Sequence, residues 1–393
     1  MTRFRLLGML VALSAAAFLI STSGVVMSPF FHAIAQALDT DLAAVANLFS
    51  VLAFTWGVSS LLAGAASDRF GRRPILIASV LLMGIAQAGF ASAPSYTHAA
   101  IWQMLTGACG GAFMGTVFAA VSDHVPSEFR GRALGWLITG QSLSLVLGVP
   151  LVTLLGALGG WRHAILNYGL VMLVTAIIVW SLVPRDPPKH ESTTAERVPL
   201  RTIMKPRLLA LIGASIMERS CFATVAVYLA PYLQSSYGIT LTQLALGLGL
   251  VAAGNLVGNV VGGQIADRFP ARPLSYAMTA LSTAALALPL ILWQPGLQIS
   301  LALGFAYSLA NSLGRPPLMA ALSEVPSSIR GTVLGLNITG ASVGWLSATA
   351  LGGWLLTQFG FAALAVISAT AGCIGALLAV LAWRADRAQF SVA

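Results

Sequence analysis

Charged residues are scarce in this sequence. They make up 8% of its 393 residues, whereas hydrophobic residues make up 57%, and the mean hydropathy is +0.86. A soluble domain carries roughly 25% charged residues, so a surface with so few charges does not suit water. We therefore expect lipid to surround most of the chain, and the composition excludes a soluble domain.

The sequence also lacks the residue groups that catalysis or metal binding requires. Its three cysteines, Cys109, Cys221 and Cys373, lie far apart inside apolar runs, which is typical of small packing side chains. The five histidines are scattered, and no glycine-rich phosphate loop with a lysine is present. We therefore predict a protein that is not an enzyme, with no catalytic residues, no metal site and no cofactor. The missing phosphate loop also disfavours ATP-driven pumping.

Positive charge is plentiful but unevenly placed. The net charge is +9, and 18 of the 21 basic residues lie in the termini or in alternate connections between apolar segments. The intervening connections contain only Arg162. This positive-inside pattern predicts that both termini and the long middle connection are cytoplasmic. The basic residues thus indicate topology, and we expect no nucleic-acid partner.

Apolar segments long enough to cross about 30 Å of hydrocarbon recur along the chain. The uncharged run from Leu6 to Phe31 exceeds the roughly 7–15-residue core of a signal peptide, so we expect it to be retained as the first span. An even number of spans agrees with two cytoplasmic termini. The twelve predicted spans are residues 6–30, 42–66, 74–93, 98–121, 133–157, 162–183, 208–233, 241–266, 274–294, 298–321, 332–356 and 360–383.

Two motifs recur about 200 residues apart and relate the two halves of the chain. The cassette GAASDRFGRRPIL at residues 64–76 returns as GQIADRFPARPL at residues 263–274. Residues 125–142 and 325–342 are identical at 11 of 18 positions. Both copies of this second motif join the fourth predicted span of a half to its fifth. The repeat therefore indicates that the two halves have the same order of spans.

The only long polar segment lies between the halves. It runs from Pro184 to Arg207, and its prolines and mixed charges are typical of a linker. We therefore predict an all-α membrane protein with two related six-helix bundles, residues 1–184 and 207–393, joined by a cytoplasmic linker at residues 185–206. Two halves inserted the same way up are an architecture of secondary transporters, with the substrate path between the halves.

With these motifs the chain resembles the major facilitator superfamily, and within it the twelve-span branch of drug–proton antiporters and sugar-efflux proteins. The resemblance covers nearly the whole chain and implies that superfamily's fold, with twelve transmembrane helices in two pseudo-symmetric bundles. It rests on the cassette, on its partial second copy, and on a glycine–proline motif in the fifth span that is associated with exporters. The matching residues are Gly64, Asp68, Arg69, Gly71, Arg72 and Arg73; Asp267, Arg268 and Arg272; and Gly148 and Pro150.

The resemblance implies that the cassette latches the inner gate while the cavity faces outward. Asp68 is predicted to follow the second span, where its carboxylate can accept hydrogen bonds from arginine or from helix N-terminal amides. Gly64 and Gly71 would permit close backbone approach and a tight turn. The alternative is a solvated turn whose arginines only set topology. The family's fourth helix usually carries an arginine where this chain has Gln103, which puts proton coupling by the usual route in doubt.

Glycines at four-residue spacing mark close helix packing. One series is Gly107, Gly111 and Gly115, and the other is Gly254, Gly258 and Gly262. Small residues at this period let membrane helices approach each other closely. We expect packing to account for both series.

Glu218 is the only one of the 12 acidic residues placed near mid-membrane, 11 residues beyond Arg207, or roughly 16 Å along a helix. An ionisable residue inside a span is a functional candidate by default. An apolar environment favours its neutral form, so Glu218 is our candidate for proton coupling or for the counter-ion of a cationic substrate. The alternative is a structural ion pair with an arginine. Arg219 is about 100° around the helix, so the two side chains need not pair.

A polar stripe is predicted in the tenth span, where Tyr307, Asn311 and Arg315 recur every four residues. Arg315 precedes two prolines about two turns from the inner end of the span, so a gate or snorkelling role is an alternative. The resemblance places the first, fourth, seventh and tenth helices around a central cavity. It assigns to that cavity Gln103, Glu218, Arg219, Tyr307, Asn311 and Arg315. Phe222 is a further candidate for an aromatic cavity wall, with packing between helices as the alternative.

We interpret the chain as a secondary active transporter that exports small, amphipathic, drug-like molecules by alternating access, in exchange for protons. The alternatives are export of sugars or metabolites by the same fold, and an uncoupled facilitator or importer, which Gln103 favours. We expect a monomer in a bacterial inner membrane. Its partners would be the small-molecule substrate, protons and the lipid bilayer.

Overall fold

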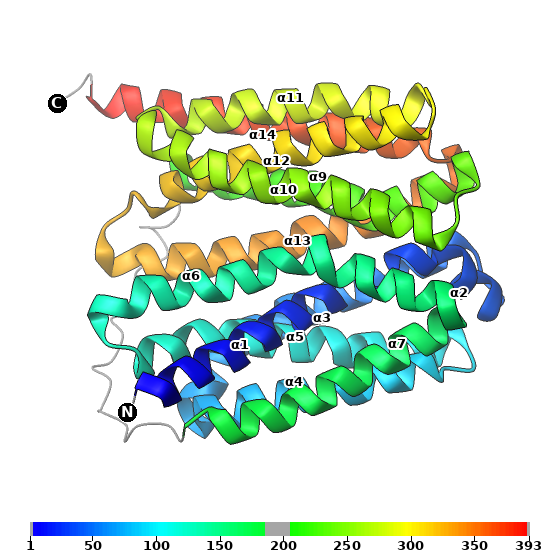
Figure 1. Ribbon diagram of the computed structural model, residues 1–393. Coiled ribbons are helices and arrows are strands. Elements are labelled where there is room, and N and C mark those ends of the chain that lie inside the picture. The colour runs from blue at the N-terminus through cyan, green and yellow to red at the C-terminus, as the bar shows by residue number, and fades with distance from the viewer. Residues whose placement is uncertain (1–2, 185–204, 391–393) are drawn as a thin grey trace. The chain divides into compact units, whose positions relative to one another are not determined.

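The computed structural model describes residues 3–184 and 205–390, and these residues are helical almost throughout, with no strand among them (Figure 1). The chain divides into two compact units, with the boundaries Met1–Thr194 plus Thr240–Gly249 and Ala195–Ile239 plus Leu250–Ala393. The predicted linker at residues 185–206 lies almost entirely outside the described residues. The division into two six-helix bundles and a linker therefore stays a prediction.

In the N-terminal unit, long helices pack side by side. Helix α5 packs against both α3 and α4, helix α4 also packs against α7, and α1 packs against α6 and α7. The elements are α1 (Arg3–Ser23), the 3₁₀ turn η1 (Ser28–Phe30), α2 (Phe31–Ala37), α3 (Leu42–Phe70), α4 (Arg72–Ala91), α5 (Tyr96–His124), α6 (Ser127–Leu143), the π-helical segment η2 (Ser144–Gly148) and α7 (Val149–Leu182).

In the C-terminal unit, α9 and α11 pack against most of the other helices. Helix α11 packs against α12 and α14, and α9 packs against α12, α13 and α14. The Tyr276 hydroxyl of α11 donates to the Ala214 carbonyl of α9 at 2.9 Å. The helices are α9 (Pro206–Tyr237), the part of α10 (Leu241–Arg268) from Leu250 onward, α11 (Arg272–Leu292), α12 (Leu297–Ser323), α13 (Ser327–Phe359) and α14 (Ala362–Phe390).

Nine helical segments of the described chain are long and apolar enough to cross a membrane. One of them, residues 129–182, covers the two predicted spans 133–157 and 162–183. Gly160 separates these two spans, since its φ of +80° breaks the helix and is a conformation that glycine adopts readily. Helices α12 and α13 are not among the nine, although they cover the predicted tenth and eleventh spans. The multi-pass architecture is confirmed, and the total of twelve stays a prediction.

The cassette is more helical than we expected. Asp68 was predicted to follow the second span, but it lies inside α3, which continues to Phe70. Alanines precede Asp68 in the sequence and favour helix, so the helix ends only at Gly71. This glycine has a φ of +97° and separates α3 from α4. The predicted charged turn is therefore a single residue between two helices.

The two glycine series confirm the packing prediction. A Cβ on Gly107 of α5 would lie 2.2 Å from the Leu52 carbonyl oxygen of α3, and a Cβ on Gly111 would lie 2.2 Å from the Trp56 carbonyl oxygen. In the C-terminal unit, a Cβ on Gly258 of α10 would lie 2.6 Å from the Leu309 carbonyl oxygen of α12. Such distances leave no room for a side chain, so each pair of helices touches backbone to backbone.

Candidate functional site

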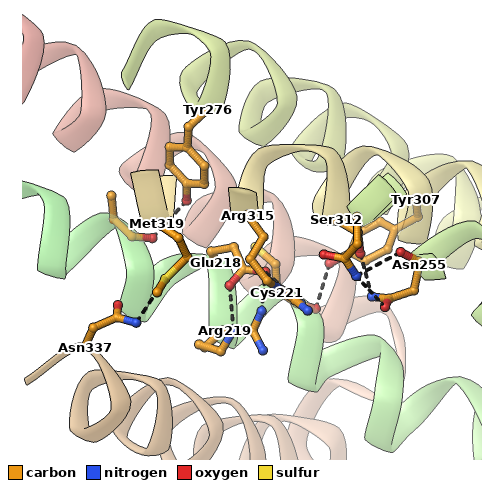
Figure 2. Close-up of polar contacts among 12 residues, drawn as sticks. Glu218, Arg219, Cys221, Asn255, Tyr276, Tyr307, Ser312, Arg315, Met319 and Asn337 are labelled. Carbon is orange, nitrogen blue, oxygen red and sulfur yellow. Dashed lines mark hydrogen bonds and ion pairs between the residues drawn. The ribbon is translucent and has the colours of Figure 1, made fainter. Parts of the chain in front are cut away.

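A buried ion cluster lies between α9 and α12 of the C-terminal unit (Figure 2). Glu218 is 3% exposed. Its Oε2 accepts from Arg219 Nε at 2.5 Å and its Oε1 from Arg219 Nη2 at 2.8 Å. Its Oε1 also accepts from Arg315 Nε at 3.2 Å and Nη2 at 3.1 Å. Both carboxylate oxygens are thus occupied by guanidinium groups from two helices.

The adjacent residues Glu218 and Arg219 pair despite their angular separation on the helix. The long arginine side chain reaches back around α9 and presents two nitrogens to the carboxylate, which is the favourable geometry for a guanidinium. Arg315 approaches the same carboxylate from α12, 97 positions later. Removing Glu218 from this cluster would leave two buried guanidinium groups without a counter-ion, so both arginines depend on the carboxylate.

Phe222 lies one turn beyond Glu218 on α9 and contacts both arginines. The Cζ atoms of Arg219 and Arg315 each lie 5.0 Å from the centre of its ring, within the range of cation–π attraction. The ring pairs with Trp345 of α13 in a T-shaped contact with 5.8 Å between centroids. The two guanidinium groups therefore lie beside an aromatic surface formed by Phe222 and Trp345, which we call the aromatic wall.

The predicted stripe on α12 splits into different environments. The Tyr307 hydroxyl is 2.8 Å from the Cys221 carbonyl oxygen of α9 and 2.5 Å from Ser368 Oγ of α14, so it links three helices. Asn311 is 6% exposed, and its Oδ1 has no hydrogen-bond partner among the described residues. Of the three stripe residues, Arg315 is the one that joins Glu218. A cavity-lining role for Tyr307 and Asn311 stays a prediction.

Gln103 is fully buried in the N-terminal unit. Its Nε2 lies 3.2 Å from Met27 Sδ, and its Oε1 has no partner within the described part of the chain. A buried amide oxygen without a partner is unusual and often marks a functional or solvated position. Its predicted place in a central cavity is untested.

Arg72 is the centre of the N-terminal cassette. Its Nη1 pairs with Asp68 at 2.8 Å and lies 2.7 Å from Ser67 Oγ, while its Nε donates to Asp123 at 2.9 Å. The neighbouring Arg73 donates to the Trp180 carbonyl of α7 at 2.6 Å. The arginines thus tie the α3–α4 turn to the ends of α5 and α7.

The close-approach role expected for Gly64 is wrong in this structure, because a Cβ there would have no described atom within 4 Å. The tight turn expected at Gly71 is confirmed by its positive φ. Arg69 lies with its guanidinium carbon 5.4 Å from the ring of its neighbour Phe70.

The second cassette forms a related cluster at the end of α12. Arg272 pairs with Glu324 and donates from Nε to the Ala266 carbonyl at 3.1 Å. Arg207, near the start of α9, pairs with the same carboxylate at 2.8 Å. Asp267 and Arg268 are exposed at the end of α10.

Our sequence reasoning missed Asp123 and Glu324. Asp123 lies at the end of α5 and pairs with Arg72 of the first cassette, whereas Glu324 caps the end of α12 and pairs with Arg272, which aligns with Arg73. The available signal was their place just before the repeated Val-Pro-Ser, with Glu324 adjacent to it and Asp123 one residue further away. An acid that recurs beside a repeated motif is a candidate partner for the basic residues of that repeat.

The exporter motif packs the fifth span against the first. A Cβ on Gly148 would lie 2.2 Å from Thr22 Oγ1 of α1. Gly148 ends the π-helical segment, and Pro150 occupies the first turn of α7. Proline has no N–H to donate to the preceding turn, and π-helical segments occur frequently at functional sites. The geometry accounts for the glycine by packing, and the motif's role in export remains a prediction.

Many apolar helices long enough to cross a membrane, with a charged cassette in each half of the chain, are typical of a multi-pass membrane protein. The chain belongs to the Major Facilitator Superfamily, whose family model matches residues 13–229 and residues 211–391. It is 26% identical over 377 residues to the inner membrane transport protein YdhP of Escherichia coli O157:H7, covering 95% of this chain and 96% of that protein.

Further comparisons agree with this assignment. The chain is 26% identical over 337 residues to a chloramphenicol resistance protein of Streptomyces lividans, covering 84% of this chain and 86% of that protein. The solved structure of a D-xylose–proton symporter matches with a TM-score of 0.78 at 18% identity, covering 96% of this chain and 97% of that one, which shows the fold. The protein is thus a transporter and not an enzyme.

Proposed function

We propose that the protein exports small, amphipathic organic molecules by alternating access, in exchange for protons, in the drug-efflux branch of its superfamily. Similarity to the chloramphenicol resistance protein supports export. The glycine–proline motif at Gly148 and Pro150 supports the same direction of transport. Similarity to an inner membrane protein supports a bacterial inner membrane, and the distribution of basic residues supports two cytoplasmic termini.

The observation that carries the coupling part of the proposal is the buried carboxylate of Glu218. A proton on Glu218 removes the negative charge that holds Arg219 and Arg315. Since these residues connect α9 to α12, protonation weakens an ion pair between two helices of the C-terminal unit. Exchange of this proton between the two sides of the membrane would drive the cycle.

Proteoliposomes with an internal pH-sensitive dye test the proposal. Chloramphenicol, ethidium and 2-naphthoate serve as probes, and we expect at least one to produce proton movement opposite to its own. The Glu218→Gln variant should lose this proton movement, whereas Asp39→Asn, which makes the same change at an exposed acid, should retain it. Full coupling in the Glu218→Gln variant would remove the assignment of Glu218. If the native protein moves none of the three probes under a proton gradient, the proposal as stated fails.

An uncoupled facilitator or a sugar or metabolite efflux protein is the second candidate. Two observations favour the uncoupled form: Gln103 has no titratable group, and Glu218 is held by two arginines that stabilise its charged form. The same liposomes distinguish the candidates. A facilitator equilibrates a probe in either direction without proton movement.

A further inference from the structure

We infer that Arg219 and Arg315 form a binding site for organic anions, so that the transported molecule carries a carboxylate or a similar singly charged acid group. The inference rests on the proposed transport of small organic molecules, but it does not require proton exchange. It names a substrate class that the buried cluster recognises through its charge, its free hydrogen-bond donors and its aromatic neighbour.

Charge is the first argument. Two guanidinium groups and one carboxylate leave one uncompensated positive charge, and no further ion pair among the described residues joins the three. An unbalanced charge within a membrane-spanning unit is unfavourable. One bound monoanion neutralises the cluster, whereas a cation would double the imbalance.

Accessibility is the second argument. The Glu218 side chain is 2% exposed, whereas the side chains of Arg219 and Arg315 are 17% and 24% exposed. The two arginine side chains are therefore the more accessible members of the cluster, and a molecule that reaches it meets an arginine side chain before the carboxylate. This order argues against Glu218 as the counter-ion of a cationic substrate, which was one of our expectations.

Hydrogen-bonding capacity is the third argument. Each arginine contacts Glu218 through Nε and Nη2 and makes no hydrogen bond through Nη1 to any described residue. A guanidinium carries five N–H donors, so each retains donors for a second acceptor. Glu218 fixes the two guanidinium planes and acts as a positioning residue, while the remaining donors bind the incoming acid group.

The aromatic wall is the fourth argument. The centre of the Phe222 ring lies 5.0 Å from both guanidinium carbons, and the ring makes a T-shaped contact with Trp345. An acid attached to an apolar ring can place its charge on the arginines and its ring near Phe222. A small inorganic anion would use only the charges, so the site favours an amphipathic acid over chloride or phosphate.

A matched set of three probes tests the inference with the full-length protein in detergent micelles. The probes are 2-naphthoate, its neutral amide 2-naphthamide, and the cation 2-naphthylmethylammonium, and binding is measured by isothermal titration calorimetry. We expect naphthoate to bind at least about tenfold more tightly than the amide, which is a typical effect of hydrogen bonds to a charged group. The cation should bind more weakly than the amide.

Arginine variants locate the site. Arg315→Gln leaves Glu218 paired with Arg219, so the variant should fold, and it should lose the preference for naphthoate over the amide. Arg384→Gln, at an exposed arginine of α14, should keep it. Equal binding of acid and amide, preference for the cation, or an unchanged preference in folded Arg315→Gln would overturn the inference. Thermal unfolding of each variant shows which ones are folded. Arg315→Lys, which retains the positive charge but not the guanidinium group, is the second variant to measure if Arg315→Gln does not fold.

Transport separates this inference from the proposed function. If liposomes export ethidium against a gradient while naphthoate neither binds nor moves, the anion site is wrong and the exporter proposal survives. If naphthoate binds through Arg315 but none of the three transport probes moves against its gradient, the anion site stands and the active-export proposal fails.

Discussion

Replacing Glu218 with glutamine should destabilise the C-terminal unit strongly, because it removes the negative member of a buried three-residue cluster. The substitution leaves Arg219 and Arg315 close together without a counter-ion, and both keep most of their surface buried. Removing one partner of a buried ion pair typically costs about 3–5 kcal/mol. We expect a loss of that order for Glu218→Gln.

The companion substitution Arg315→Gln should cost less. It leaves Glu218 bonded to Arg219 through two nitrogens, so the remaining pair is neutral. The double variant Glu218→Gln with Arg315→Gln retains one arginine, and its net charge equals that of the native cluster. Its loss of stability should therefore fall short of the sum of the two single losses by about 1–3 kcal/mol, the range for residues in one network.

Equilibrium unfolding by sodium dodecyl sulfate in mixed micelles, followed by circular dichroism, measures all four proteins. Asp39→Asn controls for the change from carboxylate to amide at an exposed site and should unfold with the native protein. Additive losses, or a native-like Glu218→Gln variant, would refute the reasoning. Such a result would mean that water rather than Glu218 compensates the two guanidinium groups.

Three further predictions concern other parts of the chain. Gly107→Leu should prevent folding, since the Leu52 carbonyl oxygen of α3 lies 2.2 Å from the position of the new Cβ. The control Gly135→Leu has open space at this position and should give a monodisperse peak in size-exclusion chromatography. Equal yields of monodisperse protein from the two variants would contradict the packing. Arg162→Gln should lower stability by about 1–3 kcal/mol, because Nη1 donates to the carbonyls of Ala91 and Ala93 at 2.7 and 3.0 Å; an unchanged melting temperature would mean that water replaces these bonds. Asp123→Asn should slow transport several-fold, because it removes the ion pair with Arg72. It should change stability by less than about 1 kcal/mol, since the Asp123 side chain is 39% exposed. Unchanged transport would exclude the Arg72–Asp123 pair from gating.

The apolar spans and the repeat were readable in the sequence because they depend on composition along the chain. A run of apolar residues is unsuited to water whichever neighbour it packs against, so the helices of both units were expected near their observed positions. Glu218 was identifiable for the same reason, since a single acid stands out within an apolar span. Helix ends were less predictable: α3 passes through Asp68 and stops only where Gly71 supplies a positive φ.

The sequence did not show which helices pack against each other. The glycine series lies on α5 in one unit and on α10 in the other, yet each brings together the second and fourth helices of its half. Close approach requires small residues on one helix of a pair, and either helix can supply them. The linear pattern therefore predicted tight packing but did not name the partner.

The sequence by itself determined that this is a multi-pass, duplicated, helical membrane protein with one exceptional buried acid, because hydropathy and repetition are properties of the chain in order. Only the tertiary structure decided that Arg219 and Arg315 share that acid and both lie against Phe222, and that Asp123 and Glu324 pair with arginines of the two cassettes. Those contacts depend on the rotation and spacing of packed helices. A rotation by one residue, about 100°, would carry each side chain away from its partner.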